Sequence, residues 1–359
     1  MSWSAWDFAS TSGFTASLPL AQSTIDLDVA GRPDERVVER ALDDPMTQVM
    51  FVNGPRVAVW RSDGVQAPDA LMCDADPAAP RPDASAPVGH LNMAFIAGPA
   101  VRTEALREGA LAVYLGRDRT EDRVVRYIAL DVTRLGEQTG PRYESDLLAR
   151  IGASCDWVEL RSFAPCASAR EAGLAVSAVA VCSWHASQRF CPSCGAPTRP
   201  ILGGWAQACT NPEDADRLLF PRIEPAVITA IVDDSDRILL QHNRAWRPRF
   251  HSVSAGFVEA GESLEHAVRR EAVEEVGIAL GDVAYLGSQP WPFPASIMLA
   301  FRARALDSHI AVDGDEVESA RWFTRDELVR AVACGAIEPP GRASIARHMI
   351  ESWLGRELA

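Results

Sequence analysis

The sequence predicts a mixed α/β or α+β protein whose C-terminal part is a sheet sandwiched between helices. Strand-like runs rich in β-branched and aromatic residues recur at short spacing in both halves of the chain. In the second half such runs lie on both sides of a clearly marked helix, an order that favours helices packed on the faces of a sheet. With 359 residues the chain exceeds one ordinary hydrophobic core, so we expect two or three domains.

The first half, to about residue 180, predicts one mixed domain. Its strand-like runs are QVMFV, RVAVWR, ALAVYLG and VVRYIAL. Residues 67–89 are rich in Pro, Ala and Asp, which predicts a surface loop, and residues 167–189 space Ala, Leu and Val as a helix does. This half carries no motif with chemistry, so we expect a scaffold or dimer-forming role for it.

The second half predicts further strands and two helices. PAVITAIV and RILLQHN are expected to pair as a hairpin across the turn at 233–236, and SVSAGFVE and SIMLAFRARAL are two more strands. One helix runs from about Glu262 to Val276 and stops at Gly277, a residue suited to a left-handed C-cap. The other begins at Thr324, where Thr324 and Glu327 match a capping box.

The charge balance limits the possible ligands. The formal net charge is −14, and the chain contains no lysine. A P-loop lysine, a Schiff-base lysine and a kinase-type strand lysine are therefore excluded. A bound phosphate would have to be met by arginine, backbone amides or a metal ion. The acidic charge disfavours an extended nucleic-acid groove, whereas a single nucleotide or one nucleic-acid end bridged by metal ions is compatible with it.

Segment patterns and cysteine usage bear on location. The chain has no apolar run of about 18 residues, and its N-terminus, MSWSAWDFASTSG, lacks the basic start and apolar stretch of a secretory signal. Five of the eight cysteines are scattered in ordinary surroundings, as reduced thiols are in a reducing compartment. We therefore expect a cytoplasmic protein with no membrane association.

The other three cysteines form a cluster. Cys191 and Cys194, in FCPSCG, have the two-residue spacing that lets two thiolates reach one tetrahedral ion, and Cys209 follows at a separation close to that of a zinc ribbon. The expected fourth cysteine is missing, and Asp214 lies near its place among other acidic residues. A carboxylate can complete a zinc site. We therefore expect either a structural Zn²⁺ on these four residues or a degenerate ribbon without metal, and the acidic surroundings disfavour DNA reading.

The strongest chemical signal is GFVEAGESLEHAVRREAVEEVGI, residues 256–278. On a helix, Glu271, Glu274 and Glu275 lie at i, i+3 and i+4, so they project from one face. Crowded carboxylates repel one another, which is unfavourable on a merely solvated face but suits a cage for hard divalent cations. The alternative is a solvent-exposed acidic helix without a functional role. The fixed spacing of Gly256, Glu262, Arg270 and Gly277 around the glutamates disfavours it.

This segment resembles the Nudix box, G-x5-E-x7-R-E-U-x-E-E-x-G-U with U a bulky aliphatic residue. Every fixed position matches, and only Ala272 is smaller than usual, which concerns packing. The resemblance implies a Nudix α/β/α sandwich that hydrolyses a nucleoside diphosphate linked to another group, using Mg²⁺ or Mn²⁺.

The resemblance also assigns roles to individual residues. Metal would be bound by Glu271, Glu274 and Glu275, together with Glu316, which matches a downstream acidic ligand. Glu275 is the candidate base for the proton of the attacking water. Glu262 and Arg270 are expected to pair with each other and hold the loop–helix–loop shape.

A second motif narrows the substrate class. SQPWPFPAS, residues 288–296, resembles the motif that marks NADH pyrophosphatases within the Nudix superfamily. The resemblance implies cleavage of NADH or NAD⁺ into NMNH or NMN and AMP. It implies that two aromatic side chains sandwich a base or nicotinamide ring, Phe220 and Phe257. The full set of expected substrate-binding residues is Phe220, Phe257, Gln289, Trp291, Ser296 and Ala346.

The resemblance is detailed from about Trp184 to the C-terminus. It implies three domains: an N-terminal Nudix-like domain over 1–183, a zinc ribbon over 184–221 and a catalytic Nudix domain over 222–359. It further implies a homodimer, and it leaves removal of NAD caps from RNA 5′ ends as an alternative main role. A non-catalytic nucleotide sensor is a second alternative, which lost carboxylates would favour, and none is lost.

Overall fold

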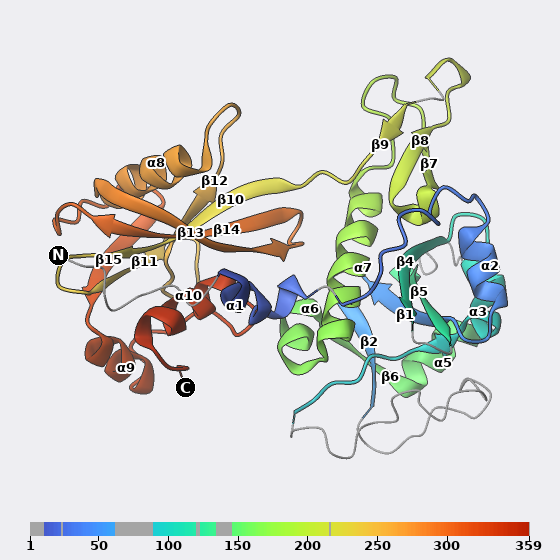
Figure 1. The fold of residues 1–359 in the computed structure, drawn as a ribbon, viewed down its shortest axis with the longest axis horizontal. Helices are drawn as coiled ribbons and strands as arrows, with labels where there is room; N and C mark the ends of the chain where they lie inside the picture. The colour runs from blue at the N-terminus through green and yellow to red at the C-terminus, as the bar shows by residue number, and fades with distance from the viewer. Residues whose placement is uncertain are drawn as a thin grey trace. The chain divides into compact units, whose positions relative to one another are not determined.

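The computed structural model describes residues 11–22, 24–61, 89–119, 123–133, 146–214 and 217–358. The loop predicted over 67–89 lies outside these residues except for Gly89. By compactness the chain divides into two units (Figure 1). The first consists of Met1–Ala21, Ile223–Trp291 and Ala295–Ala359, and the second of Gln22–Arg222 and Pro292–Pro294. The division into domains 1–183, 184–221 and 222–359 stays a prediction.

The second unit contains a six-stranded sheet of order β4-β5-β1-β2-β6, with β3 paired to β1. Strands β1 and β5 run parallel, and the other pairs run antiparallel. The four predicted strand runs of this half correspond to β1, β2, β4 and β5. The elements are α2 (Val37–Asp43), β1 (Gln48–Asn53), β2 (Arg56–Trp60), β3 (Ile96–Ala97), α3 (Gly98–Ala105), β4 (Leu111–Arg119), β5 (Val124–Asp131), α5 (Asp146–Ser154), β6 (Cys155–Glu159), α6 (Leu160–Phe163), η3 (Ala164–Cys166) and α7 (Ala169–Ser187).

Helix α7 is the predicted helix of this half and leads into a small three-stranded sheet. Ser168 and Glu171 form a capping box at its start. The small sheet has the order β7-β8-β9, from β7 (Thr198–Ile201), β8 (Ala206–Cys209) and β9 (Leu218–Leu219), with η4 (Leu202–Gly204) and η5 (Pro212–Asp214) between them. The imidazole of His185 on α7 lies 2.7 Å from the Gly204 carbonyl and 2.9 Å from Gln207 Nε2, so the small sheet is tied to the helix end.

The first unit also contains a six-stranded sheet, with the order β13-β14-β10-β11-β15 and β12 paired to β10. Helix α8 packs on one face, over a core that includes Val227, Leu239 and Val276. Helices α9 and α10 pack with the other face, over a core that includes Leu240 and Met349. The expected sandwich is therefore present. The elements are β10 (Glu224–Val232), β11 (Ile238–Asn243), β12 (Ser254–Phe257), α8 (Leu264–Val276), β13 (Leu280–Trp291), β14 (Ser296–Ala305), β15 (Val317–Phe323), α9 (Arg325–Ala333) and α10 (Ile345–Leu354).

The N-terminal segment belongs to this first unit. Helix α1 (Thr11–Ala16) and the turn η1 (Pro19–Ala21) precede the second unit in sequence but pack against β13. Leu18 is fully buried in the core beside α10. A Cβ at Gly287 would lie 2.6 Å from Thr15 Oγ1, so the segment approaches the backbone of β13 closely. The prediction of a continuous domain over 1–183 made no provision for this packing.

The two large sheets share one topology. In each, a parallel pair (β1–β5, β10–β14) is flanked by antiparallel strands in the same order. The register of the outer antiparallel pair shifts at a Tyr-Leu-Gly tripeptide in both, at Tyr114–Gly116 and at Tyr285–Gly287. Helix α3 follows β3 as α8 follows β12. The N-terminal sheet thus has the Nudix-like architecture that the resemblance implied.

No helix in the described part of the chain has the length and apolar character needed to cross a membrane.

Candidate active site and zinc ribbon

The glutamate-bearing helix α8 is delimited by its own sequence. Ser263 is the N-cap, and its hydroxyl accepts a hydrogen bond from the His266 amide at 3.2 Å. Gly277 ends the helix in the left-handed conformation, with φ of 71°. Val268, Ala272 and Val276 are buried under the helix, whereas Glu271 is half-buried and Glu274 is exposed. Helix α3, at the matching place in the other sheet, carries a single glutamate, Glu104, and so lacks this cluster.

Glu271 lies directly against the loop that starts the motif. A Cβ at Gly256 would be 2.0 Å from the Glu271 carboxyl carbon, so only glycine leaves room for this carboxylate. Partial burial raises the pKa of Glu271, and the neighbouring charges of Glu274 and Glu316 act in the same direction. Glu271 therefore lies where three carboxylates influence one another.

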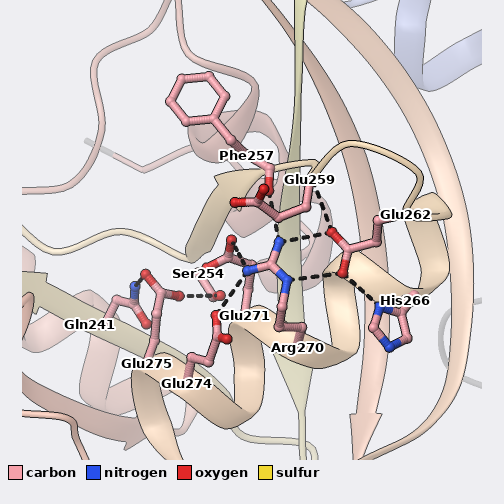
Figure 2. A network of polar contacts seen from close by, with 10 residues as sticks. All are labelled: Gln241, Ser254, Phe257, Glu259, Glu262, His266, Arg270, Glu271, Glu274 and Glu275. Atoms are coloured by element: carbon pink, nitrogen blue, oxygen red, sulfur yellow. Dashed lines mark hydrogen bonds and ion pairs between the residues drawn. The ribbon is translucent and has the colours of Figure 1, made fainter.

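Arg270 is the hub of the polar network (Figure 2). Its guanidinium donates to both oxygens of Glu262, each at 2.9 Å, so the predicted pair is present. The same group contacts Glu271 and Glu274 at 2.8 Å each, and the Phe257 carbonyl at 2.8 Å. These charge-assisted bonds lower the pKa of Glu262 to about 2. Arg270 thus holds the loop ahead of the helix and orients two of the glutamates.

Glu275 has a different environment from the other glutamates of the helix. It is 5% exposed, and each of its oxygens accepts a hydrogen bond from a strand side chain. Gln241 Nε2 lies 2.8 Å from Oε1, and Ser254 Oγ lies 2.5 Å from Oε2. Burial is the main cause that raises the pKa of Glu275 to about 7. Neither Gln241 nor Ser254 was among the predicted site residues; the available signal was a polar residue ending the apolar run ILLQ of a buried strand.

Glu316 lies just before β15 and faces the same region. Its carboxylate accepts from Asn243 Nδ2 at 3.0 Å, and its charge raises the pKa of both Glu271 and Glu275. The four predicted ligands are thus electrostatically coupled, and their hard oxygen donors fit a divalent cation. They are not drawn into a tight group, because the Arg270 guanidinium lies between Glu271 and Glu274. A divalent ion would compete with it for these oxygens.

The six predicted substrate residues lie in different environments. The Phe257 and Phe220 rings are exposed, but they belong to different compact units, so their pairing around a ring stays a prediction. Trp291 and Ser296 are cross-strand partners at the end of the β13–β14 hairpin. Gln289 is fully buried and donates to the Ala343 carbonyl at 2.8 Å, next to the start of α10.

That start of α10 also holds the sixth residue, Ala346, which is buried and whose amide is 3.3 Å from the Ser344 hydroxyl. The Gln289 side chain therefore ties the SQPWPFPAS motif to α10. Its predicted direct contact with substrate stays a prediction.

The cysteine cluster is the tightest group of potential metal ligands in the described residues. One ligand atom from each of Cys191, Cys194, Cys209 and Asp214 lies within 4.8 Å of the others. The two thiols of Cys194 and Cys209 are 3.4 Å apart, and Cys191 Sγ is 3.4 Å from Asp214 Oδ2. Ligands of a tetrahedral zinc ion with bonds of about 2.3 Å are separated by a little under 4 Å, so the donor set fits Zn²⁺.

Asp214 is further oriented by a neighbour. Arg217 Nε contacts both of its oxygens, at 2.9 and 2.8 Å, and lowers the pKa of this carboxyl. The carboxylate is therefore held in its ionised form, which a metal ligand requires.

Known families match both the glutamate helix and the cysteine cluster. Residues 222–346 match the family model described as the NUDIX domain, and residues 186–214 match the NADH pyrophosphatase zinc ribbon domain. The chain is 44% identical over 209 residues to "NAD-capped RNA hydrolase NudC" of Mycobacterium tuberculosis strain H37Rv, which covers 56% of this chain and 66% of that protein. It is 36% identical over 274 residues to "Nudix hydrolase 19, chloroplastic" of Arabidopsis thaliana, covering 73% and 60%.

Among solved structures, a NUDIX hydrolase from Nitrosomonas europaea matches 47% of this chain and 95% of its own, at 22% identity and a TM-score of 0.36. The matches thus span about two thirds of the length of the mycobacterial protein and less of the Arabidopsis one. The segment matched by the zinc-ribbon model contains the cysteine cluster, and the segment matched by the NUDIX model contains the glutamate helix. The chain therefore carries a Nudix domain over residues 222–346 and, ahead of it, an NADH pyrophosphatase zinc ribbon over residues 186–214.

Proposed function

We propose that this protein is a divalent-metal-dependent hydrolase that cleaves the pyrophosphate bond of NADH or NAD⁺, releasing AMP and NMNH or NMN. The observation that carries the proposal is the combination of an intact glutamate helix with an intact SQPWPFPAS motif, whose residues 288–291 and 295–296 lie in the same compact unit as the helix. The match to the family model described as the NADH pyrophosphatase zinc ribbon domain supports NADH or NAD⁺ as the substrate class.

The residues divide the work according to their contacts. Glu271, Glu274, Glu275 and Glu316 would hold Mg²⁺ or Mn²⁺, which when bound neutralises pyrophosphate oxygens and makes a water more acidic. Glu275, fixed by two strand side chains, is oriented to accept the proton of that water.

The surrounding residues hold this arrangement in place. Arg270 fixes the Phe257 carbonyl and the carboxylates of Glu271 and Glu274 relative to one another. The exposed Phe257 ring, at the end of β12, offers a flat apolar surface on which a base or nicotinamide can stack.

The decisive experiment incubates purified protein with NADH and either Mg²⁺ or Mn²⁺ and measures AMP. We expect AMP and NMNH in equal amounts, and none when the divalent ion is left out. Absence of AMP with both metals would reject the proposal. The non-catalytic sensor would in that case be favoured if NADH still bound.

Removal of the NAD cap from RNA 5′ ends is a second candidate function. Its support is the name of the mycobacterial relatives, which are NAD-capped RNA hydrolases. The net charge of −14 opposes tight binding of a long polyanion. Comparing kcat/KM for free NADH with that for a short NAD-capped RNA at the same ionic strength decides between the two.

We further propose that Cys191, Cys194, Cys209 and Asp214 bind one structural Zn²⁺. The four ligand atoms come from the small three-stranded sheet and the loops beside it, a region with little core of its own, where a metal staple would contribute directly to folding. A homodimer in the cytoplasm completes the proposal, on the basis of the family resemblance and the scattered free thiols. Zinc content and sedimentation of the native protein test both points.

A further inference from the structure

Both oxygens of Glu275 are engaged by side chains from strands, at points distant in sequence (Figure 2). Gln241, on β11, donates at 2.8 Å to Oε1, and Ser254, at the start of β12, donates at 2.5 Å to Oε2. The donors are 34 and 21 residues away from Glu275 along the chain. They approach from two adjacent segments, since Gln241 is bridged through its backbone to Ser252, two residues ahead of Ser254.

Packing alone does not account for a glutamine at this place. Gln241 is 2% exposed and follows three buried apolar residues on β11. Its Oε1 has no hydrogen-bond partner, and a buried amide oxygen without a partner destabilises the fold. The amide therefore directs its donor at Glu275 while leaving its acceptor unsatisfied, an arrangement that an apolar residue would avoid.

Two donors on two oxygens restrict the carboxylate in a way that one cannot. The terminal torsion of a glutamate is broad, because it joins an sp³ to an sp² carbon. A hydrogen bond to each oxygen fixes the plane of the group. Each oxygen still keeps a lone pair that neither donor uses, so the group remains able to bind a cation or accept a proton.

We propose that Gln241 and Ser254 are positioning residues that fix the plane of the Glu275 carboxylate for metal binding and proton transfer. The inference rests on the proposed function, because it requires Glu275 to act in the metal-dependent step. Neither residue touches the substrate in this proposal; both act through Glu275.

The test uses the full-length protein and four variants. Ser254→Ala and Gln241→Met remove one donor each, Ser254→Thr keeps the hydroxyl, and Ser252→Ala makes the same chemical change at a buried neighbour outside the network. Each protein is assayed for kcat and KM with NADH and Mn²⁺, and Mn²⁺ binding is measured by electron paramagnetic resonance without substrate. Thermal unfolding confirms that each variant is folded.

We expect Ser254→Ala and Gln241→Met to lower kcat about 10- to 100-fold and to weaken Mn²⁺ binding about 10-fold, the range found for residues that orient metal ligands. The KM for NADH should stay within about two-fold, because ground-state binding is untouched. Ser254→Thr should recover most of the loss, and Ser252→Ala should behave as wild type.

Unchanged kcat and Mn²⁺ binding in both donor variants would overturn the inference, as would equal losses in Ser252→Ala. Should the wild type release no AMP, the proposed function fails and Mn²⁺ binding alone decides. Weaker binding in Ser254→Ala than in Ser252→Ala then supports the positioning role, and equal binding overturns it. If Gln241→Met does not fold, the Ser254 variants decide in the same way.

Discussion

Replacing Glu275 by glutamine should abolish most of the activity and yet stabilise the protein at alkaline pH. Burial raises the pKa of Glu275 from its ordinary value of 4.5 to about 7. A group whose pKa is raised in the folded state stabilises the fold fully below its unfolded pKa. That contribution is lost as the pH rises through the folded pKa. Without divalent metal, ionised Glu275 therefore costs stability above pH 7.

The magnitude follows from the difference between the two pKa values. It corresponds to roughly 3 kcal/mol in total, of which about 2.5 kcal/mol is lost between pH 5 and pH 8. Glutamine does not titrate, so it removes this pH dependence. The substitution is also compatible with the surrounding hydrogen bonds. If the Gln241 side-chain amide turns over, its Oε1, which has no partner, can accept a hydrogen bond from the new glutamine amide. The glutamine variant should therefore gain about 2.5 kcal/mol relative to wild type between pH 5 and pH 8.

Urea unfolding at pH 5, 6, 7 and 8 without added Mg²⁺ or Mn²⁺ measures this difference, since titrating groups that do not interact with Glu275 contribute equally in the two proteins. Turnover of NADH at saturating Mn²⁺ is measured in parallel, and we expect a loss of at least ~100-fold. Parallel stability curves for the two proteins would refute the argument from burial. An unchanged turnover would show that Glu275 has no role in the reaction.

Three further predictions concern the parts that surround this carboxylate. Asp214→Ala should lose most of the bound zinc, as measured by elemental analysis after dialysis. Asp214→Cys should retain zinc against a chelator better than wild type, and the control Glu213→Ala should match wild type. Glu262→Gln should lower turnover about 10-fold by releasing Arg270. Because the pKa of Glu262 is depressed to about 2, its contribution is present above pH 4.5 and lost as the pH falls towards 2, so this variant should show a flatter stability curve in that range. Leu18→Ala should destabilise the C-terminal unit by about 3 kcal/mol in urea unfolding, because its side chain is fully buried there; no change would mean that the N-terminal segment does not pack as described.

The elements that the sequence predicted well are those whose signals are local. Helix α8 begins after Ser263 and ends at Gly277, within two residues of the prediction, because capping residues and the left-handed glycine act within one turn of the chain. The pairing of Glu262 with Arg270 was likewise predicted and is present. The convergence of Asp214 with the three cysteines follows from short spacings along one segment of 24 residues, 191–214, around the small sheet.

The residues that the sequence did not reveal depend on contacts between distant segments. The predicted contact of Gln289 with substrate stays a prediction, but the hydrogen bond from its amide to the Ala343 carbonyl, 54 residues further along the chain, is visible only in the structure. The N-terminal segment carries no sequence pattern that predicts its packing against the rest of the first unit. Leu18 nevertheless completes the core beside α10. This packing exists only because the chain, after forming the second unit, continues with the strands and helices of the first unit, to which Leu18 also belongs.

By itself the sequence determined which carboxylates share a helical face and which cysteines share a ribbon. Both follow from helical and turn geometry over a few residues, so they can be read without knowing where the segment lies. The tertiary structure alone decided that Glu275 is buried, and that Gln241 and Ser254 hold its two oxygens. The physical reason is that desolvation and side-chain hydrogen bonding depend on strands brought together by the sheet, and no local pattern records which strands those are.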